Sequence, residues 1–125
     1  MGDETDAAFY AARYDGELRY VDDQLARLLA ALEARGLDED TLVVVTSDHG
    51  EDMGEHGVWF SHGWTLFDPA LHVPLVLALP GGLPEGRRYE DLVQSVDVLP
   101  TVLALLGREH GAPTQGRDLR ALLAG

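Results

Sequence analysis

The sequence predicts an α/β protein, and more narrowly one part of an α/β/α sandwich whose sheet is mostly parallel. Two apolar segments, 41–46 and 73–79, have the length and composition of strands, and helical patterns precede the first and follow the second. The order is therefore helix, strand, long loop, strand, helix. Two strands are too few for a complete sandwich, so the chain is expected to form only a portion of one.

The helical pattern before the first strand covers residues 6–35. Its apolar side chains recur at intervals of three and four residues, as in a helix with one buried stripe; they are Leu18, Val21, Leu25, Leu28, Leu29 and Leu32. Gly36 is a typical helix stop, and Gly16 is an interior weak point at which the helix is able to divide.

The strand over 41–46 is continuously apolar rather than alternating, which is typical of a strand covered on both faces in a parallel sheet. In the second strand Pro74 has no N–H to donate, so it is expected at the start of the strand or on an edge. Further on, Asp97 is predicted to be the N-cap of a helix that runs to residue 106 and ends at Gly107. A short segment, 117–123, finishes the chain.

Composition excludes several classes of function. The 125 residues are 46% hydrophobic and carry a formal charge of −13, so a disordered chain and a nucleic-acid partner are both unfavourable. There is no Cys, which excludes disulfides, thiolate zinc sites and a cysteine nucleophile within this chain. No apolar run has the length of a membrane span, and the acidic first residues do not resemble a signal peptide, so neither a membrane partner nor a particular compartment is predicted.

The loop between the strands, 48–72, holds the candidate site. It begins with Asp48-His49-Gly50 at the end of a strand, where ligands gather in open α/β sheets. A carboxylate beside an imidazole suits a divalent cation, although the same tripeptide is also common as a capped turn. Both interpretations stay open on these residues alone.

Three histidines of this loop fall within fourteen positions. His56 is predicted to be a hydrogen-bonded loop residue that fixes Glu51 or the backbone, and His72 to be structural. His62 differs from them because Trp59-Phe60 precede it and Gly63-Trp64 follow it. We expect this imidazole to be held as a cationic or donor group for an anionic substrate.

Five blocks of sequence resemble, in order, the second half of the catalytic domain of the sulfatase family, in the alkaline phosphatase superfamily. They are Thr46-Ser47-Asp48-His49-Gly50-Glu51, Gly54-Glu55-His56-Gly57, Leu71-His72-Val73-Pro74-Leu75, Asp97-Val98-Leu99-Pro100-Thr101 and Gly116-Arg117-Asp118-Leu119. Their order makes the resemblance specific, and it implies an alkaline-phosphatase-like α/β/α sandwich.

The resemblance also implies roles for individual residues. Asp48 looks like the carboxylate ligand of the family's divalent cation, and His49 looks like its neighbouring ligand. Ca²⁺ is the first expectation for that cation, with Mn²⁺ or Zn²⁺ as alternatives. His62 lies near the position where the family has a substrate-contacting Lys, and this chain contains no Lys, so His62 is the expected catalytic substitute.

One family feature does not occur here. The Cys/Ser-x-Pro-x-Arg motif, whose first residue becomes the formylglycine nucleophile, is absent from this sequence. Residues 1–125 are therefore expected to be the C-terminal portion of a sulfatase catalytic domain, with the portion that bears the nucleophile and its formylglycine outside this chain.

The function implied is hydrolysis of an anionic sulfate ester by a metal-dependent sulfatase, with this chain inactive alone. One alternative is hydrolysis of phosphate or phosphonate esters at the same kind of site. Another is a non-catalytic metal-binding or interaction domain, for which self-association through an uncovered sheet is expected because two strands cannot cover their own apolar faces.

Overall fold

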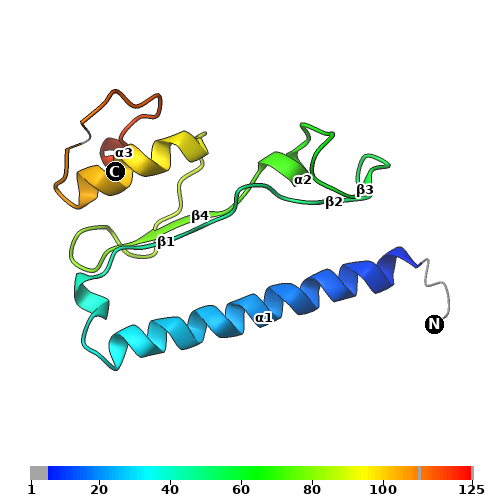
Figure 1. Cartoon of the computed structure of the whole chain (residues 1–125), viewed down its shortest axis with the longest axis horizontal. Helices are drawn as coiled ribbons and strands as arrows, with labels where there is room; N and C mark the ends of the chain where they lie inside the picture. The colour runs from blue at the N-terminus through cyan, green and yellow to red at the C-terminus, as the bar shows by residue number, and fades with distance from the viewer. Residues whose placement is uncertain (1–5, 110, 125) are drawn as a thin grey trace. The chain divides into compact units, whose positions relative to one another are not determined.

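The computed structural model describes residues 6–109 and 111–124, and its elements follow the predicted order (Figure 1). The elements are α1 (Ala7–Glu33), η1 (Asp38–Asp40), β1 (Val43–Thr46), β2 (Asp52–Met53), β3 (Trp59–Ser61), α2 (Asp68–Leu71), β4 (Leu75–Ala78), η2 (Ser95–Asp97), α3 (Val98–Leu105) and α4 (Arg120–Leu123). The described residues form two compact units: unit 1 contains residues 6–41 and 49–73, and unit 2 contains residues 42–48, 74–109 and 111–124.

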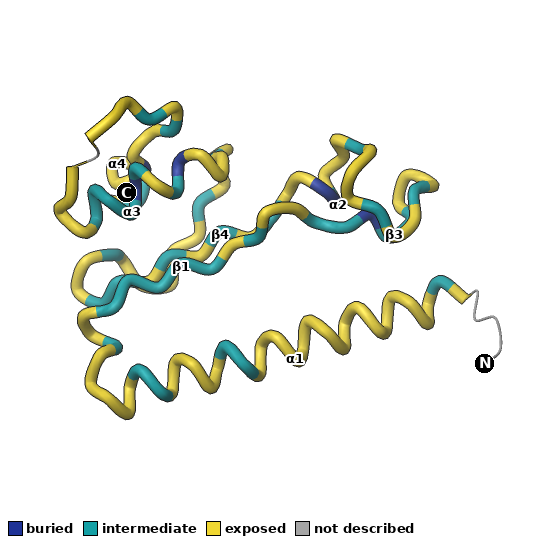
Figure 2. Tube along the Cα trace, viewed as in Figure 1, coloured by how far each residue is buried: buried dark blue, intermediate teal, exposed yellow. Residues whose placement is uncertain are grey.

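Helix α1 of unit 1 confirms the long helix predicted from the apolar spacing. The side chain of Asp6 caps it by accepting a hydrogen bond from the Ala8 N–H at 3.0 Å. Gly16 does not divide the helix, which continues to Glu33 before Gly36 turns the chain at φ 63°. No residue of α1 is buried (Figure 2). Its apolar stripe is therefore not covered within unit 1.

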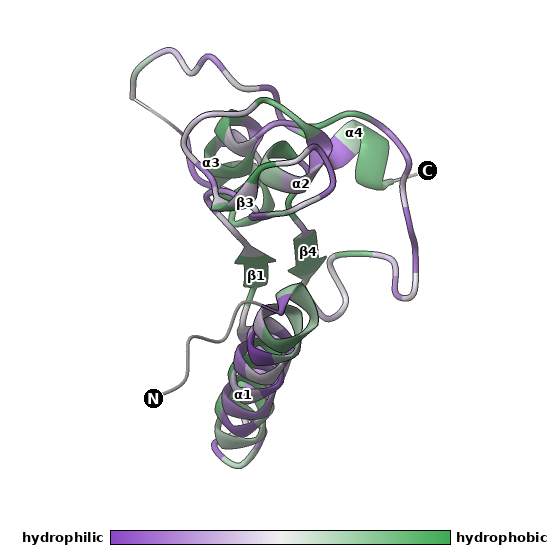
Figure 3. Ribbon diagram, turned by 90° about the vertical axis from the view of Figure 1, so that its right-hand side faces the viewer, coloured by the Kyte–Doolittle hydropathy of each residue, from purple (hydrophilic) through white to green (hydrophobic). Residues whose placement is uncertain are grey.

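Strands β1 and β4 of unit 2 confirm the two predicted strands but pair antiparallel, with Val43 opposite Ala78 and Thr46 opposite Leu75. A parallel neighbour for the first strand is therefore wrong for this pair. The reason is topological: the chain leaves β1 at the end where it enters β4, whereas a parallel pair needs a crossover to the opposite end. Both strands are strongly apolar (Figure 3), yet none of their residues is buried.

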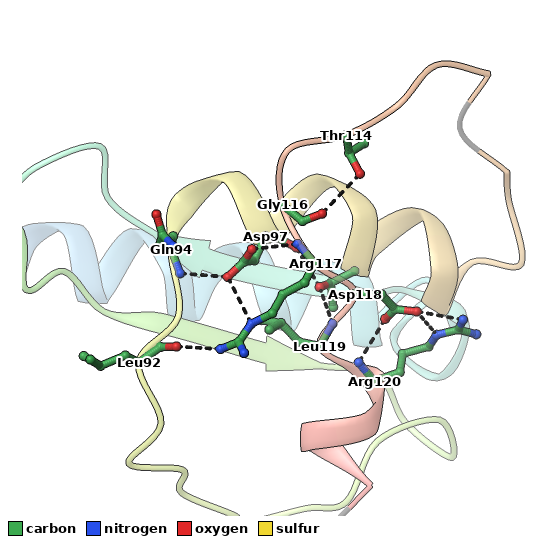
Figure 4. Close-up of polar contacts among 10 residues, drawn as sticks. Leu92, Gln94, Asp97, Thr114, Gly116, Arg117, Asp118, Leu119 and Arg120 are labelled. Carbon is green, nitrogen blue, oxygen red and sulfur yellow. Dashed lines mark hydrogen bonds and ion pairs between the residues drawn. The ribbon is translucent and has the colours of Figure 1, made fainter.

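The C-terminal part of unit 2 is organised around the carboxylate of Asp97, which is 3% exposed (Figure 4). Asp97 precedes α3 as predicted, but its side chain makes no N-cap hydrogen bond to that helix. Instead it accepts hydrogen bonds from the backbone N–H groups of Arg117, at 2.8 Å, and Gln94, at 3.0 Å. The Asp97 carboxylate thus takes part in a capping box with Gln94 at the start of η2, which leads directly into α3, and also joins this turn to the backbone at Arg117.

Thr101 extends this junction through α3. Its hydroxyl donates to the Asp97 carbonyl at 2.6 Å and accepts from the Leu119 N–H at 3.0 Å, and both Thr101 and Leu119 are buried. The hydrogen bond from the Arg117 N–H, and to a smaller extent that from the Gln94 N–H, hold the pKa of the Asp97 carboxyl below its ordinary value. These contacts give Asp97 a structural role, although not the N-cap role predicted for it.

The loop between β1 and β4 is not irregular throughout. It contains the antiparallel pair β2 and β3 and the short helix α2, all within unit 1. Among the described helices, none combines the length and apolar character that crossing a membrane requires.

Candidate functional site

The candidate site of unit 1 rests on the β2–β3 hairpin, in which Asp52 lies opposite Ser61. Gly54 has a φ of 113°, and the Trp59 ring occupies the space that a β-carbon there would need. At the same turn the Glu55 carboxylate accepts from the Met53 N–H at 2.9 Å. Hydrogen bonds from the backbone N–H groups of Glu55 itself and Met53 lower the pKa of this carboxyl. These contacts fix the turn, and none of them involves His62.

Gly50 fixes the beginning of the loop. Its N–H donates to the Ala70 carbonyl at 2.8 Å, and a β-carbon at this position would overlap the carbonyl of Pro69. Only glycine allows this close approach of two backbone segments. The approach fixes the backbone at Gly50, between His49 and Glu51, against α2.

The central contact of the site joins His62 to Glu51. The Nδ1 atom of His62 lies 2.9 Å from Oε2 of Glu51, and an ionised carboxylate only accepts, so Nδ1–H is the donor. The His62 side chain is 51% exposed, whereas that of Glu51 is 23% exposed. Oε1 of Glu51 is buried and has no hydrogen-bond partner among the described residues. The imidazole of His62 is thus half-exposed to solvent, while the Glu51 carboxylate that holds it is mostly enclosed.

His49 lies on the other side of this imidazole. The rings of His49 and His62 are stacked, with centroids 4.1 Å apart and an interplanar angle of 12°. Nδ1–H of His49 donates to the Gly50 carbonyl at 2.8 Å, which fixes the orientation of that ring. The structure therefore brings together two of the three predicted site residues, His49 and His62, within unit 1.

Asp48, the third predicted site residue, follows β1 in unit 2. Its carboxylate accepts a hydrogen bond of 3.4 Å from the hydroxyl of Ser47. The boundary between the two units falls at the peptide bond between Asp48 and His49, so each of these residues is described within its own unit.

Fit to a divalent cation is a matter of donor type and donor number. The carboxylate of Asp48 and the imidazole of His49 are donor types that such cations accept. In residues 6–109 and 111–124, however, no three His, Asp or Glu side chains gather as a metal-binding group. Asp48 and His49 therefore fit such a cation in donor type, and they supply two of the ligands that it needs.

Two residues next to the predicted site were missed. Asp52 is fully buried, and its Oδ2 accepts a hydrogen bond from the Thr65 hydroxyl, while Oδ1 has no partner among the described residues. Glu51 was placed in the motif but given no role. The signal available for both was their position directly after Asp-His-Gly, at the end of a strand where ligands gather in open α/β sheets.

The role predicted for His56 is wrong in one respect. His56 does not fix Glu51, which pairs with His62, but stacks on Phe67 with the ring centroids 3.8 Å apart. The backbone N–H of His72 donates to the Asp68 carbonyl at the end of α2, and the structural role expected for the His72 side chain stays a prediction.

Solved structures define the class of fold. The chain is 37% identical to the phosphonate monoester hydrolase of Agrobacterium radiobacter and superimposes on it with a TM-score of 0.87, over 94% of this chain and 23% of that one. This similarity confirms the alkaline-phosphatase-like α/β class, of which the present chain contains a portion.

Sequence comparison then gives the family. The sulfatase family model matches residues 3–108, and the chain belongs to this family. It is 36% identical to the multifunctional alkaline phosphatase superfamily protein PehA of Trinickia caryophylli over 98% of this chain. It is 33% identical to an arylsulfatase of Clostridium perfringens over 90% of this chain. The chain spans about a quarter of the length of each of these two relatives.

Proposed function

We propose that this chain forms part of the active site of a hydrolase of sulfate esters, in which His62 acts on the substrate. The observation that carries the proposal is the fixed imidazole: His62 is held by Glu51 on one side and stacked on His49 on the other. This arrangement occurs in a chain of the sulfatase family. A held, half-exposed imidazole in a hairpin loop is suited to donate a proton to a bound ester.

The chemistry assigned to this chain is limited to its own residues. Nδ1–H of His62 stays on Glu51, so Nε2 is the nitrogen that faces the ester. Protonated at Nε2, His62 donates that proton to the bridging oxygen as the bond from this oxygen to sulfur breaks, so the alcohol leaves neutral.

Asp48 and His49 are proposed to supply two ligands of a divalent cation, with Ca²⁺ favoured over Mn²⁺ or Zn²⁺ by the resemblance. Further ligands come from residues outside this chain. When bound, the cation would polarise the ester oxygens, and a formylglycine from outside this chain would supply the nucleophile.

A second candidate is hydrolysis of phosphate or phosphonate esters at the same site. It is favoured by one observation, the similarity to phosphonate monoester hydrolases from Agrobacterium radiobacter and Silicibacter pomeroyi, at 37% and 38% identity. Residues Asp48, His49 and His62 suit either anion, so they do not discriminate between the two reactions.

Two hybrid enzymes test the proposal. In one, residues 6–124 of this chain replace the matching segment of the Clostridium perfringens arylsulfatase, and in the other they replace that of the Agrobacterium radiobacter phosphonate monoester hydrolase. We expect the arylsulfatase hybrid to hydrolyse an aryl sulfate and to lose this activity with Asp48→Ala, while the chain alone is inert.

The outcomes separate the candidates. Activity only in the phosphonate hydrolase hybrid, towards an aryl phosphonate, would replace the first candidate by the second. Inactivity of both hybrids, each folded by circular dichroism, would reject both. Turnover by the chain alone that is lost in Asp48→Ala would show that no further portion is needed.

A further inference from the structure

We infer that Glu51 is a positioning residue that selects the tautomer of His62 and so determines which imidazole nitrogen meets the substrate. The inference rests on the proposed function of His62 for its catalytic meaning, but the pairing itself does not depend on activity. Neither the predicted site nor the family match assigns Glu51 a role.

The contact between Glu51 and His62 has the geometry of a hydrogen bond. Oε2 of Glu51 lies 2.9 Å from Nδ1 of His62, a normal distance for a hydrogen bond between an imidazole and a carboxylate. The two residues are eleven positions apart and are brought together by the hairpin that begins at Asp52 and ends at Ser61. A carboxylate accepts only, so the neutral ring must carry its proton on Nδ1.

Glu51 is itself held in place by its surroundings. The Gly50 N–H is bonded to the Ala70 carbonyl, and no side chain larger than hydrogen fits at Gly50, so the backbone before Glu51 is fixed. Its side chain is mostly enclosed, whereas that of His62 is half-exposed. A fixed partner behind a ring that faces outward orients the ring towards a ligand.

The ring of His49 stacks on the ring of His62 and also restricts its orientation. Parallel rings 4.1 Å apart restrict the rotation of His62 about its side-chain bonds, while the carboxylate restricts its rotation in the ring plane. Together the two contacts leave the Nε2 edge of His62 as the edge directed away from Glu51. The unpaired Oε1 of Glu51 makes no competing hydrogen bond with another described residue.

The direct test is the ¹⁵N spectrum of the imidazoles in the 125-residue chain, which distinguishes the two neutral tautomers. We expect the Nδ1–H form for His62 in the native chain and the reverse form, typical of an unconstrained imidazole, in Glu51→Ala. The matched control is Glu55→Ala, which removes a carboxylate from the same hairpin but not from His62. This control should leave the tautomer of His62 unchanged.

Kinetics give a second measurement that does not require the isolated chain to fold. In the arylsulfatase hybrid, Glu51→Ala should lower kcat about 10- to 100-fold and leave KM unchanged, as loss of an orienting partner does at comparable sites. Glu51→Gln, which retains an acceptor oxygen, should recover part of the loss.

The two claims fail in different ways. If the hybrid is active and depends on His62, but Glu51→Ala keeps full kcat or the Nδ1–H tautomer, the role of Glu51 is wrong and the proposed function stands. If the native chain shows the Nδ1–H tautomer and Glu51→Ala reverses it while both hybrids are inactive, the positioning of the ring is supported and the proposed function is wrong.

Discussion

Two carboxylates in different parts of the molecule have opposite surroundings. In unit 2, Asp97 is almost fully buried and both of its oxygens accept hydrogen bonds from backbone N–H groups. In unit 1, Glu51 has one oxygen on His62 and the other buried without a partner among the described residues. Its neighbour Asp52 also has one unpartnered buried oxygen.

The difference separates a structural carboxylate from one that is not explained by the fold of its own unit. Burying a polar group without a hydrogen bond costs free energy, so a fully paired group such as Asp97 stabilises the fold. Glu51 has a hydrogen bond on only one of its two oxygens, so its contacts within unit 1 offset less of the free-energy cost of burying it. We interpret the position of Glu51 as serving the site, through its contact with His62.

Asp97→Ala is expected to have the largest effect on stability. It leaves two backbone N–H groups without their charged acceptor, and hydrogen bonds to charged groups contribute about 1.5–3 kcal/mol each. We expect a loss of about 3 kcal/mol in the free energy of unfolding of unit 2, measured by urea denaturation followed through amide signals of residues 92–123. Glu51→Ala should cost less than about 1 kcal/mol in unit 1, because its partner is half-exposed. Equal losses in the two variants would remove the distinction.

Acid should destabilise unit 2 through the same carboxylate. The folded-state pKa of Asp97 lies below its ordinary value of 3.8, because the Arg117 and Gln94 N–H groups stabilise the charged form. The stabilisation is therefore fully present above pH 3.8 and is lost as pH falls through the lowered folded-state pKa. In Asp97→Asn, the free energy of unfolding should vary less over this acid range. An unchanged acid dependence in that variant would assign the effect to other carboxyls.

Metal binding by the chain alone should be the smallest effect. Two ligands are expected from Asp48 and His49, whereas Ca²⁺ takes six to eight oxygens, so calorimetric titration with Ca²⁺ should show no binding tighter than about 1 mM. Micromolar binding that disappears in Asp48→Asn would mean that this chain builds a complete site.

Local patterns in the sequence predicted the elements of both regions. The spacing of leucines predicted α1, and continuous apolar runs predicted β1 and β4, because these signals lie within one segment. The antiparallel pairing of β1 with β4 was not predicted, since register and direction depend on how the connecting segment returns. Gly16 did not divide α1 because one glycine costs only about 1 kcal/mol in a helix of 27 residues.

The site was predicted only in part for a related reason. His49 and His62 were identified from their positions after a strand and between aromatic residues. The pairing of His62 with Glu51 depends on the register of the β2–β3 hairpin, which two- and three-residue strands do not reveal in the sequence. The side-chain role of Asp97 was missed similarly, since its partner Arg117 lies twenty residues away.

The most direct test of the account is the dependence of turnover on the leaving group in the arylsulfatase hybrid. If His62 donates a proton to the departing oxygen, His62→Ala should slow a sulfate ester of a poor leaving group by about 10²–10⁴-fold and an activated aryl sulfate much less. Metal content should stay unchanged, and His62→Lys should restore part of the activity. Equal slowing of both esters, or loss of the metal in His62→Ala, would contradict the role of His62 as a proton donor to the substrate.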